Sequence, residues 1–103
     1  MVLIHNNIAK IIELCRKYKV SKLYVFGSIL TERFNDESDI DFSVDFDKDS
    51  IESAKLEWAD LFFGFLHSLE DLLQRKIDLV FDSNIRNTYF KDELDRTKQL
   101  IYG

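Results

Sequence analysis

The strongest constraint on the fold is a strict alternation of polar and apolar residues at positions 39–46. Acidic or hydroxyl side chains take every second position, and large apolar side chains lie between them. The polar set is Asp39, Asp41, Ser43 and Asp45; the apolar set is Ile40, Phe42, Val44 and Phe46. Because successive side chains of a strand point to opposite faces, this segment predicts a strand with one face in the core and one acidic face.

The rest of the chain predicts strands and helices in turn. Short runs at residues 22–26 and 76–82 are typical of strands, whereas apolar residues recur at helical spacing over residues 6–18, 51–73 and 88–98. Asn6 or Asn7 and Asn84 or Asn87 can begin helices, and Trp58 is expected in the core. We therefore expect an α/β (α+β) fold in one domain of residues 1–103, a small mixed sheet of at least three strands with helices packed on one face.

Composition excludes several classes of function. The chain has 103 residues, a net charge of −5 and one cysteine. This acidic excess argues against nucleic-acid binding, which needs Lys and Arg to replace the counterions of phosphates. No apolar run approaches the roughly 20 residues of a membrane span, and the first ten residues lack the pattern of a signal peptide. Because Cys15 cannot form an internal disulfide, we expect a cytoplasmic protein in which Cys15 packs in the core.

Three polar features stand out from the expected surface. Gly27 and Ser28 directly follow an apolar strand, where a glycine permits close approach of the backbone and a hydroxyl adds a donor. Asp39 and Asp41 share one strand face about 6.5 Å apart, so their repulsion favours a bound cation between them. Asp78 lies within a later strand, where aspartate is rare. A simple turn at Gly27 and a solvated edge strand at Asp39 and Asp41 remain the alternatives.

Together these features resemble a known family. Gly27-Ser28 is followed after ten residues by Asp39-Ile40-Asp41, and Asp78 stands in the Lys-Ile-Asp-Leu-Val strand at 76–80. This arrangement resembles the minimal nucleotidyltransferases of the polymerase-beta-like superfamily over residues 23–80. The resemblance implies the polymerase-beta-like fold, with ATP as substrate and two Mg²⁺ ions. Asp39, Asp41 and Asp78 would bind the metals and carry catalysis.

The same resemblance assigns Gly27 and Ser28 to the β- and γ-phosphates of the nucleotide. One departure stands nearby. Family members commonly carry Ala-Arg-Gly shortly after the Gly-Ser pair, whereas this chain has Leu30-Thr31-Glu32. Arg33 is close in sequence but is expected to point elsewhere if this turn is helical. The change at Thr31 and Glu32 leaves open a degenerate member that only binds.

A protein is the expected acceptor, because the chain is acidic and carries no basic domain to grip nucleic acid. Stand-alone members that resemble it are often antitoxins that neutralise a HEPN-type RNase toxin by adenylylating a tyrosine. The runner-up is a binding module that neutralises its partner by contact. A small-molecule acceptor would need a further substrate domain. Residues 61–66 are apolar on nearly every side of their helix and are expected to contact another chain as well as the core: Leu61, Phe62, Phe63, Gly64, Phe65 and Leu66.

Overall fold

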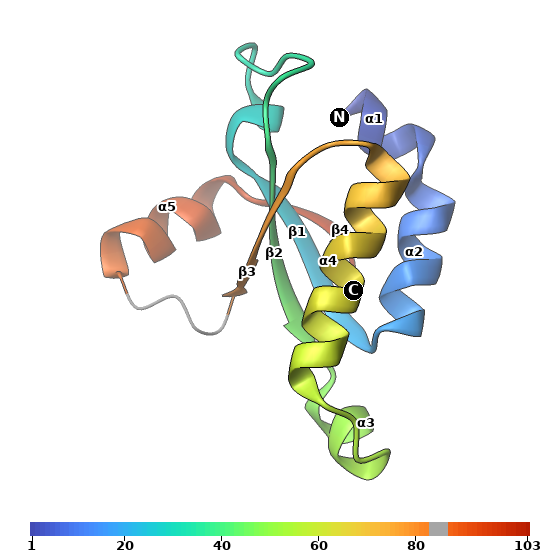
Figure 1. The fold of residues 1–103 in the computed structure, drawn as a ribbon. Coiled ribbons are helices and arrows are strands. Elements are labelled where there is room, and N and C mark those ends of the chain that lie inside the picture. The colour runs from blue at the N-terminus through green and yellow to red at the C-terminus, as the bar shows by residue number, and fades with distance from the viewer. Residues whose placement is uncertain (83–86) are drawn as a thin grey trace.

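The computed structural model describes residues 1–82 and 87–103 and has a four-stranded mixed sheet at its centre (Figure 1). Its strands are β1 (Val20–Phe26), β2 (Ile40–Phe46), β3 (Ile77–Phe81) and β4 (Gln99–Tyr102), in the order β3-β2-β1-β4. Strand β1 is antiparallel to β2 and β4, whereas β2 and β3 are parallel. The mixed sheet is confirmed, and β4 adds an edge strand that the sequence did not predict.

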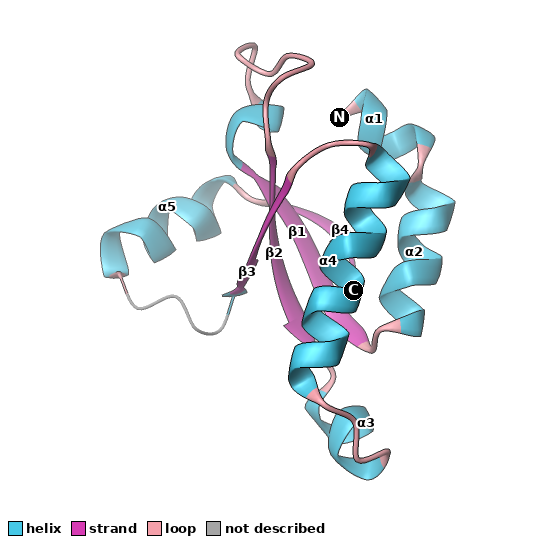
Figure 2. Ribbon diagram, viewed as in Figure 1, coloured by secondary structure: helices cyan, strands magenta, loops and turns pink. Residues whose placement is uncertain are grey.

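The helices lie on both sides of this sheet (Figures 1 and 2). Helices α2 (Ile8–Lys17) and α4 (Trp58–Leu73) cover one face, and α5 (Thr88–Thr97) lies on the other. Two short helices, α1 (Val2–Asn6) and α3 (Lys48–Ser53), precede α2 and α4, and the 3-10 helix η1 (Gly27–Leu30) follows β1. The expectation that helices pack on one face is therefore wrong for α5, which contacts the sheet through an edge-on pair of the Phe26 and Phe90 rings.

The core lies between the sheet and α2 and α4. The apolar positions of β2 point into it, as the alternation predicts, and meet the inward faces of the two helices. The fully buried side chains there include Ile11, Cys15, Leu23, Val25, Ile40, Phe42, Val44, Phe65 and Leu69, all at 0% exposure. Burial of this apolar surface is the main stabilising contribution to the fold.

Helix boundaries differ from the sequence prediction in two places. Residues 6–18 are divided between α1 and α2 at Asn7, whose side-chain amide donates to the Leu3 carbonyl instead of capping α2. The long helix predicted over residues 51–73 is interrupted at residues 54–57, where Lys55 takes a left-handed φ of 54°. Trp58 begins α4 and is 38% exposed, so its placement in the core was wrong.

The remaining helix, α5, begins as one of the two alternatives predicts. Asn87 accepts a hydrogen bond from the Phe90 N–H at 3.1 Å and so caps the helix. The other proposed start, Asn84, lies outside the described residues. Within the parts of the chain that the structure covers, no helix is both long enough and apolar enough to cross a bilayer.

Candidate active site

The candidate site begins where β1 ends. Gly27 has a φ of +78°, in the left-handed region that favours glycine. A Cβ at this position would lie only 2.3 Å from Oδ2 of Asp41, which pairs across the sheet with Phe26. The missing side chain of Gly27 therefore lets the backbone turn directly against a carboxylate.

Asp41 and Asp78 lie side by side on the two parallel strands. The register pairs Asp41 of β2 with Asp78 of β3, so both side chains occupy the sheet face opposite the core. The pKa of Asp41 is raised from 3.8 to about 6, first by burial and then by the charges of Asp78 and Asp39 and a hydrogen bond with Asp78. The carboxylates of Asp41 and Asp78, from two different strands, therefore lie next to each other.

Asp39 stands just before β2 and is less closely joined to this pair. Its Oδ2 lies 3.9 Å from Nζ of Lys76 in an ion pair that solvent largely reaches. Its charge still contributes to the raised pKa of Asp41. Over residues 1–82 and 87–103, no three side chains of His, Cys, Asp or Glu are placed together as they would be around a metal ion. The structure therefore brings Asp41 and Asp78 together and leaves Asp39 beside them.

The loop between η1 and Asp39 is held by a residue that sequence reasoning missed. Arg75 donates through Nη2 to the carbonyl oxygens of Asn35 and Ser38, each at 2.5 Å. Its guanidinium also lies over the Phe34 ring, 4.7 Å from the centroid. Because Ser38 immediately precedes Asp39, these contacts fix the approach of the chain to β2. No short-range pattern in the sequence signals contacts that span about 40 positions.

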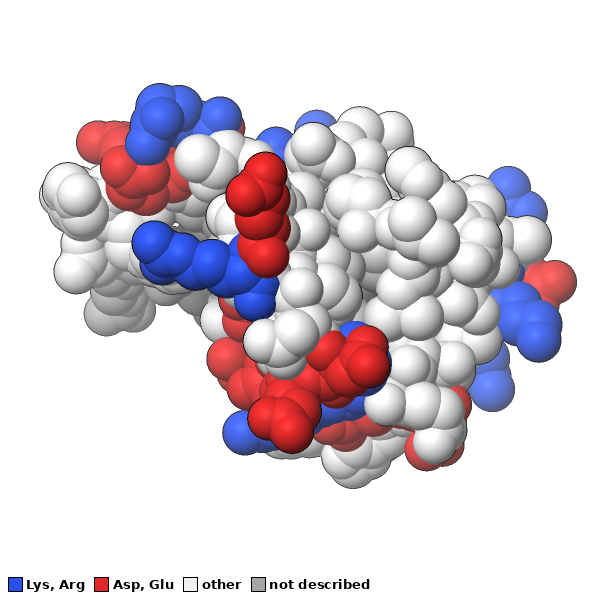
Figure 3. All heavy atoms as spheres, turned by 90° about the horizontal axis from the view of Figure 1, so that it is seen from above, with Lys and Arg blue, Asp and Glu red and all other residues white. Residues whose placement is uncertain are grey.

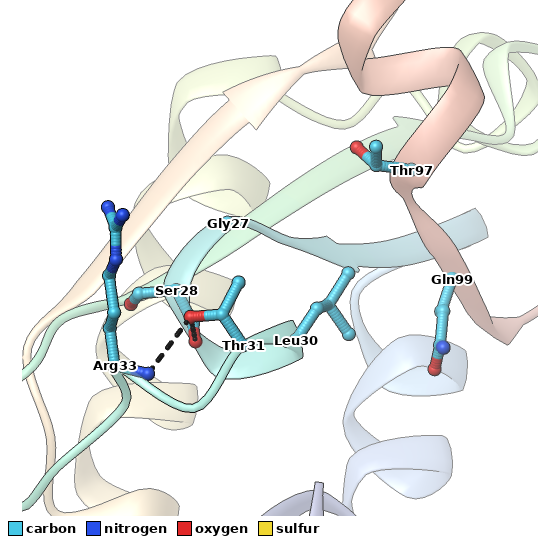
Figure 4. Close-up of a pocket in the computed structure, with 7 residues that line it drawn as sticks. All are labelled: Gly27, Ser28, Leu30, Thr31, Arg33, Thr97 and Gln99. Atoms are coloured by element: carbon cyan, nitrogen blue, oxygen red, sulfur yellow. Dashed lines mark hydrogen bonds between the residues drawn. The ribbon is translucent and has the colours of Figure 1, made fainter.

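A cavity of about 610 Å³ opens beside the Gly-Ser turn (Figure 4). Its walls are Gly27, Ser28, Leu30, Thr31, Arg33, Thr97 and Gln99. Figure 4 shows Arg33 extending along the side of Ser28, with Thr97 and Gln99 across the cavity. The expectation that Arg33 points elsewhere applied to a helical turn, but η1 ends at Leu30, before Arg33, which lines the cavity. Thr97 and Gln99 come from the end of α5 and the start of β4, which is why the sequence did not mark them.

Surface charge agrees with an acidic site. Figure 3 looks down on the end of the molecule that carries the loop before β2. Acidic side chains gather over the middle of this view, with basic groups interspersed. They lie between the mixed charges of α5 and a largely uncharged surface over the other helices. A cation is therefore favoured at this end of the molecule, and an anionic substrate needs added positive charge.

A second polar cluster anchors α5 to the same sheet face. Asp82 is 7% exposed, accepts a hydrogen bond from the Ser43 hydroxyl at 2.7 Å, and pairs with Lys91 and Lys98 at 3.0 and 3.1 Å. Burial opposes ionisation of Asp82, but these hydrogen bonds outweigh it and hold its pKa below the usual value. Lys98 also lies 3.9 Å above the ring centroid of Tyr24. The cluster thereby places Thr97 and Gln99 at the cavity.

Known proteins are similar to this chain in sequence and in fold. The polymerase beta nucleotidyltransferase family matches residues 9–103. Two Methanocaldococcus jannaschii proteins, provisionally named protein adenylyltransferases, are similar in sequence. One is 36% identical over 86 residues, which is 84% of this chain and 79% of the relative. The other is 34% identical over 90 residues, which is 87% and 83% of the two chains.

Two solved structures share the fold. One, provisionally described as a minimal nucleotidyltransferase, has a TM-score of 0.72 at 20% identity and covers 93% of this chain and 90% of its own. The other is a toxin–antitoxin structure with AMP-PNP, with a TM-score of 0.66 at 24% identity over 94% of this chain and 73% of that one. The family match and the relatives above 30% identity together decide the classification: this chain belongs to the polymerase beta nucleotidyltransferase family.

Proposed function

We propose that the protein transfers AMP from ATP to a hydroxyl group of a partner protein, and that the partner is a HEPN-type RNase toxin which the transfer neutralises. The observation that carries the catalytic part is the pairing of Asp41 with Asp78 against the side-chain-free backbone of Gly27. The provisional names of the relatives support a protein acceptor. The toxin–antitoxin structures among the fold neighbours support the partner class.

The donor atoms of this site fit Mg²⁺, which prefers oxygen ligands and commonly takes one or two carboxylates together with substrate phosphates. Asp39, Asp41 and Asp78 would hold two such ions. Burial first, and then the neighbouring charges of Asp78 and Asp39, raise the pKa of Asp41, and a bound cation would favour its ionised form, which supports such a role. Bound Mg²⁺ would lower the pKa of the attacking hydroxyl and stabilise charge on the attacking and leaving oxygens.

The chain's own residues have distinct tasks in this reaction. The Ser28 hydroxyl and the backbone at Gly27 would hold the β- and γ-phosphates. The partner's hydroxyl oxygen then bonds to the α-phosphorus, while the bond to the bridging oxygen breaks and pyrophosphate leaves with that electron pair. Asp78 is exposed on the edge strand β3, where an incoming hydroxyl can reach its carboxylate, and would accept the proton.

Transfer of label from ATP tests the proposal. The protein is incubated with Mg²⁺, ATP labelled at the α-phosphate, and a HEPN-type RNase toxin as the candidate partner. We expect label on the partner with the wild type and with Asp71→Asn, an exposed control on α4. Label should be lost with Asp41→Asn and with Asp78→Asn. Equal transfer by wild type and both site variants would overturn the site assignment.

The alternative is a binding module that neutralises its partner by contact alone. It is favoured by the absence of the family's Arg and Gly at Thr31 and Glu32, and by an exposed part of residues 61–66. Leu61 and Phe65 of that segment are buried in the core, whereas Phe63 is 54% exposed. Tight association with the partner and no label transfer under any metal condition would support this alternative.

A further inference from the structure

The cavity beside Ser28 has one cationic wall that the family pattern does not predict. At position 31, where family members commonly carry an Arg, this chain has Thr31, and the acidic Glu32 follows it. Arg33 follows and lines the cavity together with Gly27 and Ser28 (Figure 4). The positive charge missing at position 31 is therefore supplied two residues later on the wall of the same cavity.

Local hydrogen bonds hold the backbone of Arg33 in this position. The Thr31 hydroxyl donates to the Ser28 carbonyl oxygen at 2.8 Å and accepts from the Arg33 N–H at 3.2 Å. The next residue, Phe34, packs against the hydrophobic core and lies under the Arg75 guanidinium. Thr31 thus links the backbones at Ser28 and Arg33, and presents the Arg33 side chain at the cavity.

The other cations near the site are already engaged. Arg75 donates to two backbone carbonyl oxygens, and Lys76 pairs with Asp39. The Arg33 guanidinium, by contrast, makes no ion pair or hydrogen bond with any residue of the described ranges 1–82 and 87–103. It is exposed and lies at the cavity wall.

We propose that Arg33 is a phosphate-binding residue whose guanidinium holds the terminal phosphates of a nucleoside di- or triphosphate in the cavity beside Ser28. This inference rests on the proposed function, because it assigns a role within the nucleotide site. The planar fork of an Arg side chain suits phosphate oxygens better than an ammonium group does. Arg33 is also the one charged residue among those that line the cavity in the described part of the chain.

Nucleotide binding without the partner tests this role separately from transfer. Calorimetric titrations with Mg²⁺ and ATP, ADP or AMP compare wild type, Arg33→Ala, Arg33→Lys and Arg16→Ala. We expect Arg33→Ala to weaken ATP and ADP binding about tenfold, in line with a solvent-exposed charged hydrogen bond. AMP binding should change by less than twofold, because AMP lacks the terminal phosphates.

Two control variants show whether a loss of affinity comes from the guanidinium of Arg33 or from the loss of one positive charge anywhere on the protein. Arg33→Lys should retain part of the affinity, and Arg16→Ala, which removes the same charge from α2 on the opposite sheet face, should bind like wild type. Equal ATP binding by wild type and Arg33→Ala would overturn the inference and leave the proposed function standing. Equal loss of AMP and ATP affinity in Arg33→Ala would also overturn it. If wild type binds no ATP, both the inference and the proposed function fail.

Discussion

Replacing Asp41 by Asn should stabilise the metal-free protein while it abolishes transfer. Asp41 lies against Gly27 and beside Asp78, where burial and two neighbouring negative charges disfavour its ionised form. Asn has nearly the same shape and carries no charge, and its amide group can donate to the Asp78 carboxylate. The substitution therefore removes an electrostatic cost and keeps the packing.

The size of the effect follows from the pKa of Asp41. A rise from 3.8 to about 6 corresponds to about 3 kcal/mol of destabilisation at neutral pH, at about 1.36 kcal/mol for each pKa unit. Because solvent reaches part of this side chain, screening reduces the effect to about 1–2 kcal/mol. In a domain of this size, that gain raises Tm by about 5–10 °C.

The sign of the pH dependence is also determined. Since the folded state binds the proton of Asp41 more tightly than the unfolded state, the destabilisation is absent below pH 3.8 and complete above about pH 6. The stability gain of Asp41→Asn should therefore be full at pH 8 and less than half as large at pH 4.5.

Thermal unfolding in EDTA, followed by circular dichroism at both pH values, measures the gain. Asp71→Asn on α4 serves as the control and should change Tm little at either pH. Added Mg²⁺ should raise the Tm of wild type and leave that of Asp41→Asn unchanged. Loss of stability in Asp41→Asn at pH 8, or a gain of the same size at pH 4.5, would refute the electrostatic reasoning.

Three further outcomes follow from the structure. Gly27→Ala should displace the Asp41 carboxylate, because the alanine Cβ would lie 2.3 Å from Oδ2 of Asp41 at a positive φ. Label-transfer assays should show near-complete loss of activity. Denaturant unfolding should show that the free energy of unfolding falls by only about 1–2 kcal/mol. Asp82→Asn should destabilise the fold by about 2 kcal/mol, since two lysines lose their carboxylate partner near the Ser43 hydroxyl; a urea midpoint equal to that of wild type would contradict this. Burial raises the pKa of Cys15 to about 12, so the native protein should resist a thiol reagent at pH 8 and react only when unfolded; rapid native labelling would count against this packing.

The central strand could be predicted because its period is unambiguous. Alternation over residues 39–46 places Phe42 in the core and Asp41 on the opposite face, and the structure agrees. The sequence did not predict that β2 and β3 pair in the register that joins Asp41 to Asp78, because strand order is not visible in a local pattern. A shared site was expected only if the two strands pair. The structure meets that condition.

Features that depend on distant contacts or unusual backbone angles escaped prediction. Strand β4 is a short, partly exposed edge strand without clear alternation. The break before α4 depends on a left-handed Lys55, a residue type that gives no signal for that conformation. Arg75 and Lys98 act through partners 37 and 16 positions away, respectively, so their roles appear only when the chain is folded.

Anomalous diffraction from crystals grown with Mn²⁺ and a non-hydrolysable ATP analogue would test the metal site directly. We expect manganese peaks bounded by the carboxylates of Asp39, Asp41 and Asp78, with Asp39 turned away from Lys76 toward the other two. Nucleotide bound in the cavity with no manganese at these three side chains would contradict this expectation.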